Sequence, residues 1–173
     1  MYKRQLLGAT TAAAQAGAEL RTLVDQSLHL YSIVEDRRDP GETVVIKNDT
    51  LHLRYRQDLR KLTMERRNQF VCDATRWMLA GRRDTSTGLK ALLATKPSIK
   101  SVKLVAYAVD TNVSLNRKGR YDQKRKLIPQ LVLTINRERV SQIDPKKAAE
   151  NLRGKSCLKV ARTLLNQFKM SNF

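Results

Sequence analysis

The residues with the clearest chemistry form a cationic run between positions 117 and 126. The segment RKGRYDQKRK holds six basic residues in ten positions and a single acid. Lys and Arg side chains neutralise phosphates and release the counterions of a polynucleotide, so the affinity they give falls steeply with salt. Tyr121 lies among these charges and could stack on an exposed base. Because the segment has no periodicity, we expect an exposed loop or the tip of an extended hairpin.

A second cationic surface is expected on a helix over residues 57–80. Arg60 and Arg67 lie seven positions apart, which places them on one face of a helix. We expect this face, the basic pair at 82–83 and the 117–126 segment to converge on one surface of the folded chain. The predicted nucleic-acid-binding residues are Arg60, Lys61, Arg66, Arg67, Arg82, Arg83, Arg117, Lys118, Arg120, Tyr121, Lys124, Arg125 and Lys126.

The overall charge supports the same partner. The net charge is +18, from 34 Lys and Arg against 16 Asp and Glu. Residues 57–173 carry 26 of those basic residues and only nine of the acids. Such an excess costs self-repulsion unless a polyanion compensates it, and nucleic acid is the commonest cellular polyanion. We therefore expect DNA or RNA as the partner. Single strands or RNA are slightly favoured, because the basic residues fall on a sheet edge and a loop rather than on one groove-sized helix.

An enzymatic alternative depends on two carboxylates. A metal-dependent nuclease or strand-transfer enzyme needs acids that converge on one metal ion. Asp110, at the end of an expected strand, and Glu138, just past another, are the pair whose positions suggest this. No Ser/His/Asp or Cys/His arrangement can be argued, so the favoured interpretation is a binding protein without catalytic residues, metal or cofactor.

A third alternative is a structural component of a nucleoprotein assembly, of capsid or ribosomal type. It would need an exposed apolar face for self-association. The small residues of 9–18 and the apolar stripe from Leu20 to Val34 are the candidates, so a homo-oligomer would form through the N-terminal helix. A phage or other mobile-element origin would suit such a protein.

The cysteines and the hydropathy pattern bear on location. Cys72 and Cys157 lie 85 positions apart and, with His29 and His52, give no zinc-binding spacing. We expect buried, unpaired thiols, as is usual in a reducing cytoplasm. No apolar run approaches the roughly 20 residues of a membrane span. The sequence thus predicts a cytoplasmic protein without a membrane partner.

The elements that must position these residues indicate an α+β fold. In the run 51–56, Leu51 and Leu53 alternate with His52, Arg54 and Arg56, so one side of that strand is a basic surface. The expected elements begin with an N-terminal helix along the Leu20–Val34 stripe, a β-hairpin of 43–47 and 51–56, the long basic amphipathic helix 57–80 and a short helix over 86–94. An antiparallel strand pair of 102–109 and 128–136, joined by the basic loop, follows. Two C-terminal helices begin after Asp144 and Ser156, and the apolar stripe of the second one runs to Phe168.

The first five residues call for a separate interpretation. Residues 1–5, Met-Tyr-Lys-Arg-Gln, resemble the translation of a sequencing adapter, as found in open reading frames from environmental DNA. We expect them to be a scar outside the fold. Residues 6–173 are then expected to form a single nucleic-acid-binding domain, and 81–100 is the place where a division into two would fall.

Overall fold

The computed structural model describes residues 19–24, 44–81, 88–115 and 121–171 of the chain. Its centre is a mixed five-stranded sheet in the order β1-β2-β3-β4-β5, where β2 and β3 are parallel and all other neighbours are antiparallel. The predicted α+β class is confirmed. The strands are β1 (Val44–Lys47), β2 (Thr50–Arg56), β3 (Ser101–Leu115), β4 (Tyr121–Asn136) and β5 (Gln167–Met170); the helices are the 3₁₀ turn η1 (Leu59–Lys61), α3 (Met64–Ala80), α4 (Leu89–Thr95), α5 (Arg137–Gln142), α6 (Pro145–Arg153) and α7 (Cys157–Leu164).

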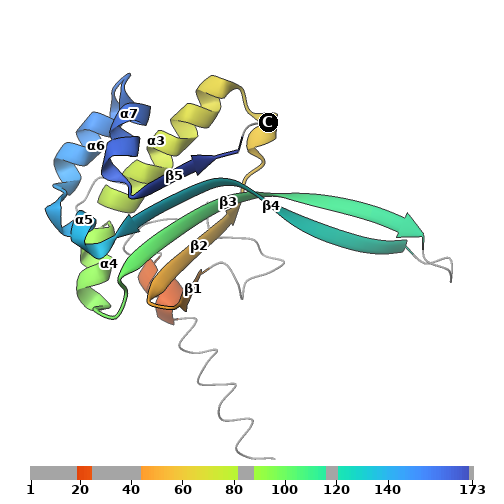
Figure 1. Cartoon of the computed structure of the whole chain (residues 1–173), viewed down its shortest axis with the longest axis horizontal. Coiled ribbons are helices and arrows are strands. Elements are labelled where there is room, and N and C mark those ends of the chain that lie inside the picture. Colours follow the sequence, from red (N-terminus) through yellow and green to blue (C-terminus); the bar gives the residue numbers. More distant parts are fainter. Residues whose placement is uncertain (1–18, 25–43, 82–87, 116–120, 172–173) are drawn as a thin grey trace, which may run out of the picture.

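Helices α3, α6 and α7 lie together over one face of the sheet (Figure 1). The strands direct alternate residues into this layer, as the period of two requires. Leu51 and Leu53 of β2 are fully buried, as the alternation in the sequence predicts. The same layer takes Leu104 from β3 and Leu131 and Leu133 from β4. The other face of the sheet therefore carries the remaining, more polar half of each strand.

The first hairpin agrees with the sequence. Its turn consists of Asn48 and Asp49, which both have positive φ, 48° and 58°. Two successive residues of that conformation make the tight turn whose twist suits a β-hairpin, and Asn and Asp tolerate it well. Thr50 already belongs to β2, and its hydroxyl lies 2.7 Å from that of Ser101 on β3.

The long helix begins later than position 57. The Gln57 N–H donates to Tyr107 O of β3 at 3.0 Å, which keeps that residue beside the sheet. Asp58 then caps η1, and Leu62 is extended. Thr63 is the true N-cap of α3, because its hydroxyl accepts the Arg66 N–H. The prediction over-extended the helix because the apolar positions before Met64 belong to a separate short turn.

The basic 117–126 segment is not simply a loop, because β4 begins at Tyr121. The two long strands pair from Ser101 with Asn136 to Leu115 with Tyr121. Their neighbours stop much sooner, since β2 pairs only as far as Tyr107 and β5 no further than Leu131. We call the two-stranded remainder the arm, consisting of 108–115 and 121–128. It projects away from the helices (Figure 1), and its eight residues of β3 span about 26 Å.

A register shift marks the root of the arm. Ala106 pairs with Leu131 and Tyr107 pairs with Pro129, so Gln130 is the extra residue of a bulge. Pro129 thus lies inside β4, beside an irregularity that tolerates a missing N–H. The buried Gln130 side chain turns towards η1, where its Oε1 accepts the Leu59 N–H at 2.5 Å.

The C-terminal region departs from the predicted pair of helices. Asp144 caps α6 as expected, accepting the N–H groups of Lys146 and Lys147. The last helix, however, ends at Leu164 rather than continuing to Phe168. The chain becomes extended at Leu165, and Phe168 belongs to β5, which adds to the edge of the sheet beside β4. The apolar stripe of the sequence is real, but it spans two elements that pack on the same core.

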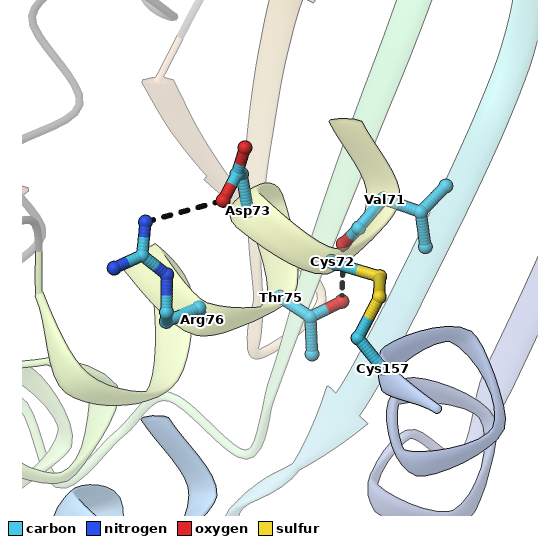
Figure 2. The surroundings of a disulfide bond; sticks show 6 residues. All are labelled: Val71, Cys72, Asp73, Thr75, Arg76 and Cys157. Carbon is cyan, nitrogen blue, oxygen red and sulfur yellow. Dashed lines mark hydrogen bonds and ion pairs between the residues drawn. A yellow bond between two sulfur atoms is a disulfide. The ribbon is translucent and has the colours of Figure 1, made fainter. Parts of the chain in front are cut away.

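The two cysteines form a disulfide, so the prediction of unpaired thiols is wrong. Cys72 of α3 and Cys157 at the first turn of α7 are joined, with their Cα atoms 5.7 Å apart (Figure 2). Cys72 is fully buried, and the Thr75 hydroxyl one turn later donates to Val71 O at 2.8 Å. The sequence spacing of 85 gives no sign of this pairing, because only the packing of α7 on α3 brings the residues together.

Little of the predicted N-terminal helix lies within the described residues. Residues 19–24 are helical, and Leu20 and Val24 are buried in the common core. Those two positions therefore cannot serve as an exposed self-association stripe. The rest of the stripe, the small-residue segment 9–18 and the adapter-like residues 1–5 lie outside the described residues. In the described part of the chain, no helix combines the length and apolarity needed to cross a membrane.

Candidate nucleic-acid interface

The face of the sheet opposite α3, α6 and α7 gathers positive side chains from four strands. On the two central strands they alternate with buried core residues: His52 lies between Leu51 and Leu53, and Lys103 lies between Val102 and Leu104. We call this group the cationic face; its cations are Lys47, Arg54, Lys103 and Lys169, and the imidazole of His52 lies among them.

The strand register brings these residues side by side. His52 pairs with Lys103 across the parallel β2–β3 ladder, and Lys169 of β5 pairs with Val132. No Asp or Glu occurs in β1, β2 or β5, nor in the described stretches 101–108 of β3 and 126–136 of β4. Within these strand stretches, the charged residues are thus all basic.

The pKa of His52 is lowered by burial and by nearby positive charges. Partial burial, followed by the positive charges of Lys103, Arg54 and Lys47, lowers the pKa of His52 from its ordinary value of 6.5. Both causes disfavour the protonated ring. The three named cations come from three different strands, so the positive potential belongs to the assembled sheet and not to one segment.

The predicted residues of the 117–126 segment divide into two groups. Arg117, Lys118 and Arg120 lie outside the described residues. Tyr121, Lys124 and Arg125 are in the arm, where their backbones pair with Leu115, Asn112 and Thr111. Lys126 pairs with Asp110 and is exposed. The arm therefore carries basic residues outward from the end of the sheet.

Two of the predicted helix residues serve local structure. The Arg60 guanidinium binds the Asp58 carboxylate, with Nε 2.9 Å from Oδ1 and Nη2 3.0 Å from Oδ2. Arg67 donates to Leu62 O at 3.0 Å and to Arg60 O at 3.3 Å, so it closes the turn before α3. The two arginines lie close together, but on η1 and α3 rather than on one helix face.

The other residues predicted for this surface are Lys61, Arg66, Arg82 and Arg83. Lys61 and Arg66 are exposed, near the root of the arm, because the Gln57–Tyr107 hydrogen bond holds η1 there. Arg82 and Arg83 lie outside the described residues. They follow Gly81, which ends α3 about 25 Å from its start. Lys61 of η1 and Lys126 of the arm thus lie towards the same end of the sheet.

Asp58 gives a testable pH dependence. Its hydrogen bonds with Arg60 lower its pKa from 3.8 to about 2, against an opposing effect of burial. Because the folded pKa lies below the unfolded one, the stabilisation is complete above about pH 4 and disappears as the pH falls towards 2. Since the carboxylate is 23% exposed, we expect a loss of about 1–2 kcal/mol.

Carboxyl NMR titration of Arg60→Ala measures the same effect directly. This variant should return the pKa of Asp58 towards 3.8, whereas Lys61→Ala, its matched control, should leave it near 2. An unchanged pKa of Asp58 in Arg60→Ala would show that the ion pair does not hold the carboxylate in solution.

The carboxylate pair of the nuclease alternative is not brought together. Asp110 pairs with Lys126 in the arm, whereas Glu138 follows Asn136, which pairs with Ser101. Nine residues of strand separate those two registers, about 30 Å, too far to share a metal ion within one copy. Among the residues that the structure describes, no group of three or more His, Cys, Asp or Glu side chains is arranged to hold a metal.

Sequence reasoning identified one strand of the cationic face and missed the others. It placed His52 and Arg54 on a basic side of β2, but it did not single out Lys47, Lys103 or Lys169. In β3 the alternation Val102, Lys103, Leu104 was a usable signal. In β5 there was none, because the segment continues an apparently helical stripe. Comparisons with protein-family models, with curated proteins and with solved structures found no match to this chain.

Proposed function

We propose that this protein binds nucleic acid through the cationic face and the adjoining arm, without chemistry and with little sequence preference. The carrying observation is the set of basic side chains that four strands bring to this face, in strand stretches that contain no Asp or Glu. Lysines and arginines on a sheet contact phosphates, which fixes position but carries no sequence information. DNA and RNA both fit this description.

Charge reversal at the centre of the face is the test. Lys103→Glu should weaken binding of a fluorescent oligonucleotide about tenfold at low salt, and it should flatten the dependence of log K on log salt, because fewer counterions are released. Lys159→Glu is the matched control. It makes the same change in net charge on the exposed side of α7, in the helix layer, and should alter binding less than threefold.

NMR of His52 gives a site-specific readout. A polyanion on the cationic face favours the protonated imidazole, so adding the oligonucleotide should raise the pKa of His52 towards or above 6.5. Equal losses of affinity in Lys103→Glu and Lys159→Glu, with no movement of the His52 resonances, would show that binding reflects overall charge and would refute this interface.

A structural role in a nucleoprotein assembly is a second candidate, favoured by the arm. An isolated two-stranded ribbon is at best marginally stable in water. The long projecting arm would therefore be stabilised by contact with nucleic acid or with another subunit, as in a nucleoprotein assembly. Sedimentation with and without a polynucleotide separates this role from binding by a monomer.

The cytoplasmic location expected from the sequence stays a proposal, and the disulfide counts against it. Disulfides persist in oxidising surroundings and are rare in the reducing cytoplasm. The Cys72–Cys157 bond fits a protein that functions outside that compartment or in an assembled particle. Quantification of free thiols in protein isolated under acid quench distinguishes the two locations. Free thiols would indicate the reducing cytoplasm, and a bonded pair would indicate oxidising surroundings or an assembled particle.

A further inference from the structure

A cavity of about 340 Å³ opens on the cationic face at the root of the arm. Its lining has two chemical parts. One part is positive and comes from the cationic face. The other is apolar and comes from β3 and β4. The lining residues are His52, Arg54 and Lys103, then Val105, Tyr107, Leu127, Pro129 and Val132.

The register places His52 and Lys103 at one end and Tyr107, Leu127 and Pro129 at the other, with Arg54 level with Val105 and Val132 between them. His52 and Lys103 are directly paired on adjacent strands. Tyr107, which pairs with Pro129, lies four residues further along β3, about 13 Å from Lys103. Leu127 is 50% exposed, so the apolar end is open to a ligand. One ligand could therefore meet positive charge at one end of the cavity and an apolar surface at the other.

We infer that this cavity takes one unstacked base of a single-stranded nucleic acid, with the adjacent phosphates on His52, Arg54 and Lys103. The inference rests on the proposed function and narrows its substrate class. A single strand can turn a flat base into a pocket while its backbone follows cations, whereas the bases of a duplex are stacked and paired. A phosphate alone would leave the apolar end unfilled, and an apolar peptide would bring no anion to the positive end. The volume is at the lower end of small-molecule sites, which suits one base with its sugar.

Oligonucleotides with and without bases test this without any substitution. Fluorescence anisotropy at one low salt concentration compares a short oligothymidylate, an abasic strand of equal length and a duplex. Both single strands present the same phosphates, so the difference between them isolates the base. We expect the oligothymidylate to bind about tenfold more tightly than the abasic strand.

A cavity-filling variant then locates the effect. Val132→Phe adds apolar volume inside the cavity and leaves the charge unchanged. It should reduce oligothymidylate binding to the abasic level while abasic binding stays the same. Val45→Phe is the control, because Val45 lies on the same face but outside the lining. Thermal melting of both variants confirms that they are folded.

The outcomes separate the two proposals. Equal affinity for the oligothymidylate and the abasic strand overturns the base pocket and leaves phosphate binding intact. Tighter binding of the duplex, or of an acidic peptide containing an aromatic residue, also overturns it. Failure of every polynucleotide to bind at low salt refutes the proposed function itself, and the inference with it.

Discussion

Replacing Cys157 with Ser should lower the free energy of unfolding by about 4 kcal/mol. The disulfide closes a chain segment with a sequence separation of 85, and the loop-entropy model gives a little over 4 kcal/mol for a loop of that size. Cys157 is the better position to change because it is only half-buried, whereas Cys72 is fully buried and a Ser there would leave a hydroxyl in the core.

Denaturant titration with and without reductant makes this result specific. A reductant should destabilise the wild-type chain by a similar amount and should leave Cys157→Ser unchanged. The double variant with Cys72→Ser should be about as stable as Cys72→Ser alone, because both substitutions remove the same bond. If reductant does not shift the wild-type midpoint, the two cysteines are not bonded in solution.

Gly88→Ala should cost about 3 kcal/mol of stability or more. Gly88 precedes α4, where the chain passes against the end of α3. A Cβ at this position would lie 2.2 Å from Leu79 O and 2.7 Å from Ala80 N. Both atoms belong to helix backbone, which cannot rotate aside as a side chain can. The two helices would have to separate and expose Leu89 and Leu92, which are fully buried.

Gly154→Ala is the matched control for this clash. Gly154 ends α6 with φ of −77°, which any residue adopts, and a Cβ there would lie 3.5 Å from Asn151 O, an ordinary contact. Its effect should be within about 1 kcal/mol and towards stabilisation, because Ala restricts the unfolded chain. Thermal unfolding of both variants provides the comparison. Equal midpoints would mean that α4 does not approach α3 as closely as described.

Local signals in the sequence predicted the local structure well. The Asn48–Asp49 turn, the alternation of β2 and the Asp144 cap all depend on residues within a few positions of one another, and the structure contains each of them. The start of α3 and the end of α7 were misplaced. In both cases hydrogen bonds to distant strands, Gln57 to Tyr107 and Asn166 to Thr134, decide where the helix stops or starts.

The candidate site was harder to predict than the fold, because composition does not reveal which cations are already used. Arg137 shows why. Its guanidinium donates to the carbonyls of Leu93, Lys96 and Ile99 at 2.8–2.9 Å, so this charge serves to hold α4 against the strand ends. The guanidinium groups of Arg60 and Arg67 likewise make local hydrogen bonds, to the Asp58 carboxylate and to Leu62 O. Lys103 on β3 becomes part of the cationic face only because β2 pairs beside it, and its partner His52 lies 51 positions earlier in the sequence.

The parallel pairing of β2 with β3 also determines the order in which this molecule can assemble. A parallel pair cannot close through a tight turn, so η1, α3 and α4 must be accommodated before the central ladder gains its first contacts. The entropy of closing that long connection is lost before any pairing repays it, which makes the ladder a late and slow event. Until this ladder forms, the facing edges of β2 and β3, two strands rich in apolar residues, stay unpaired. The nascent chain is then most exposed to misassembly with other copies.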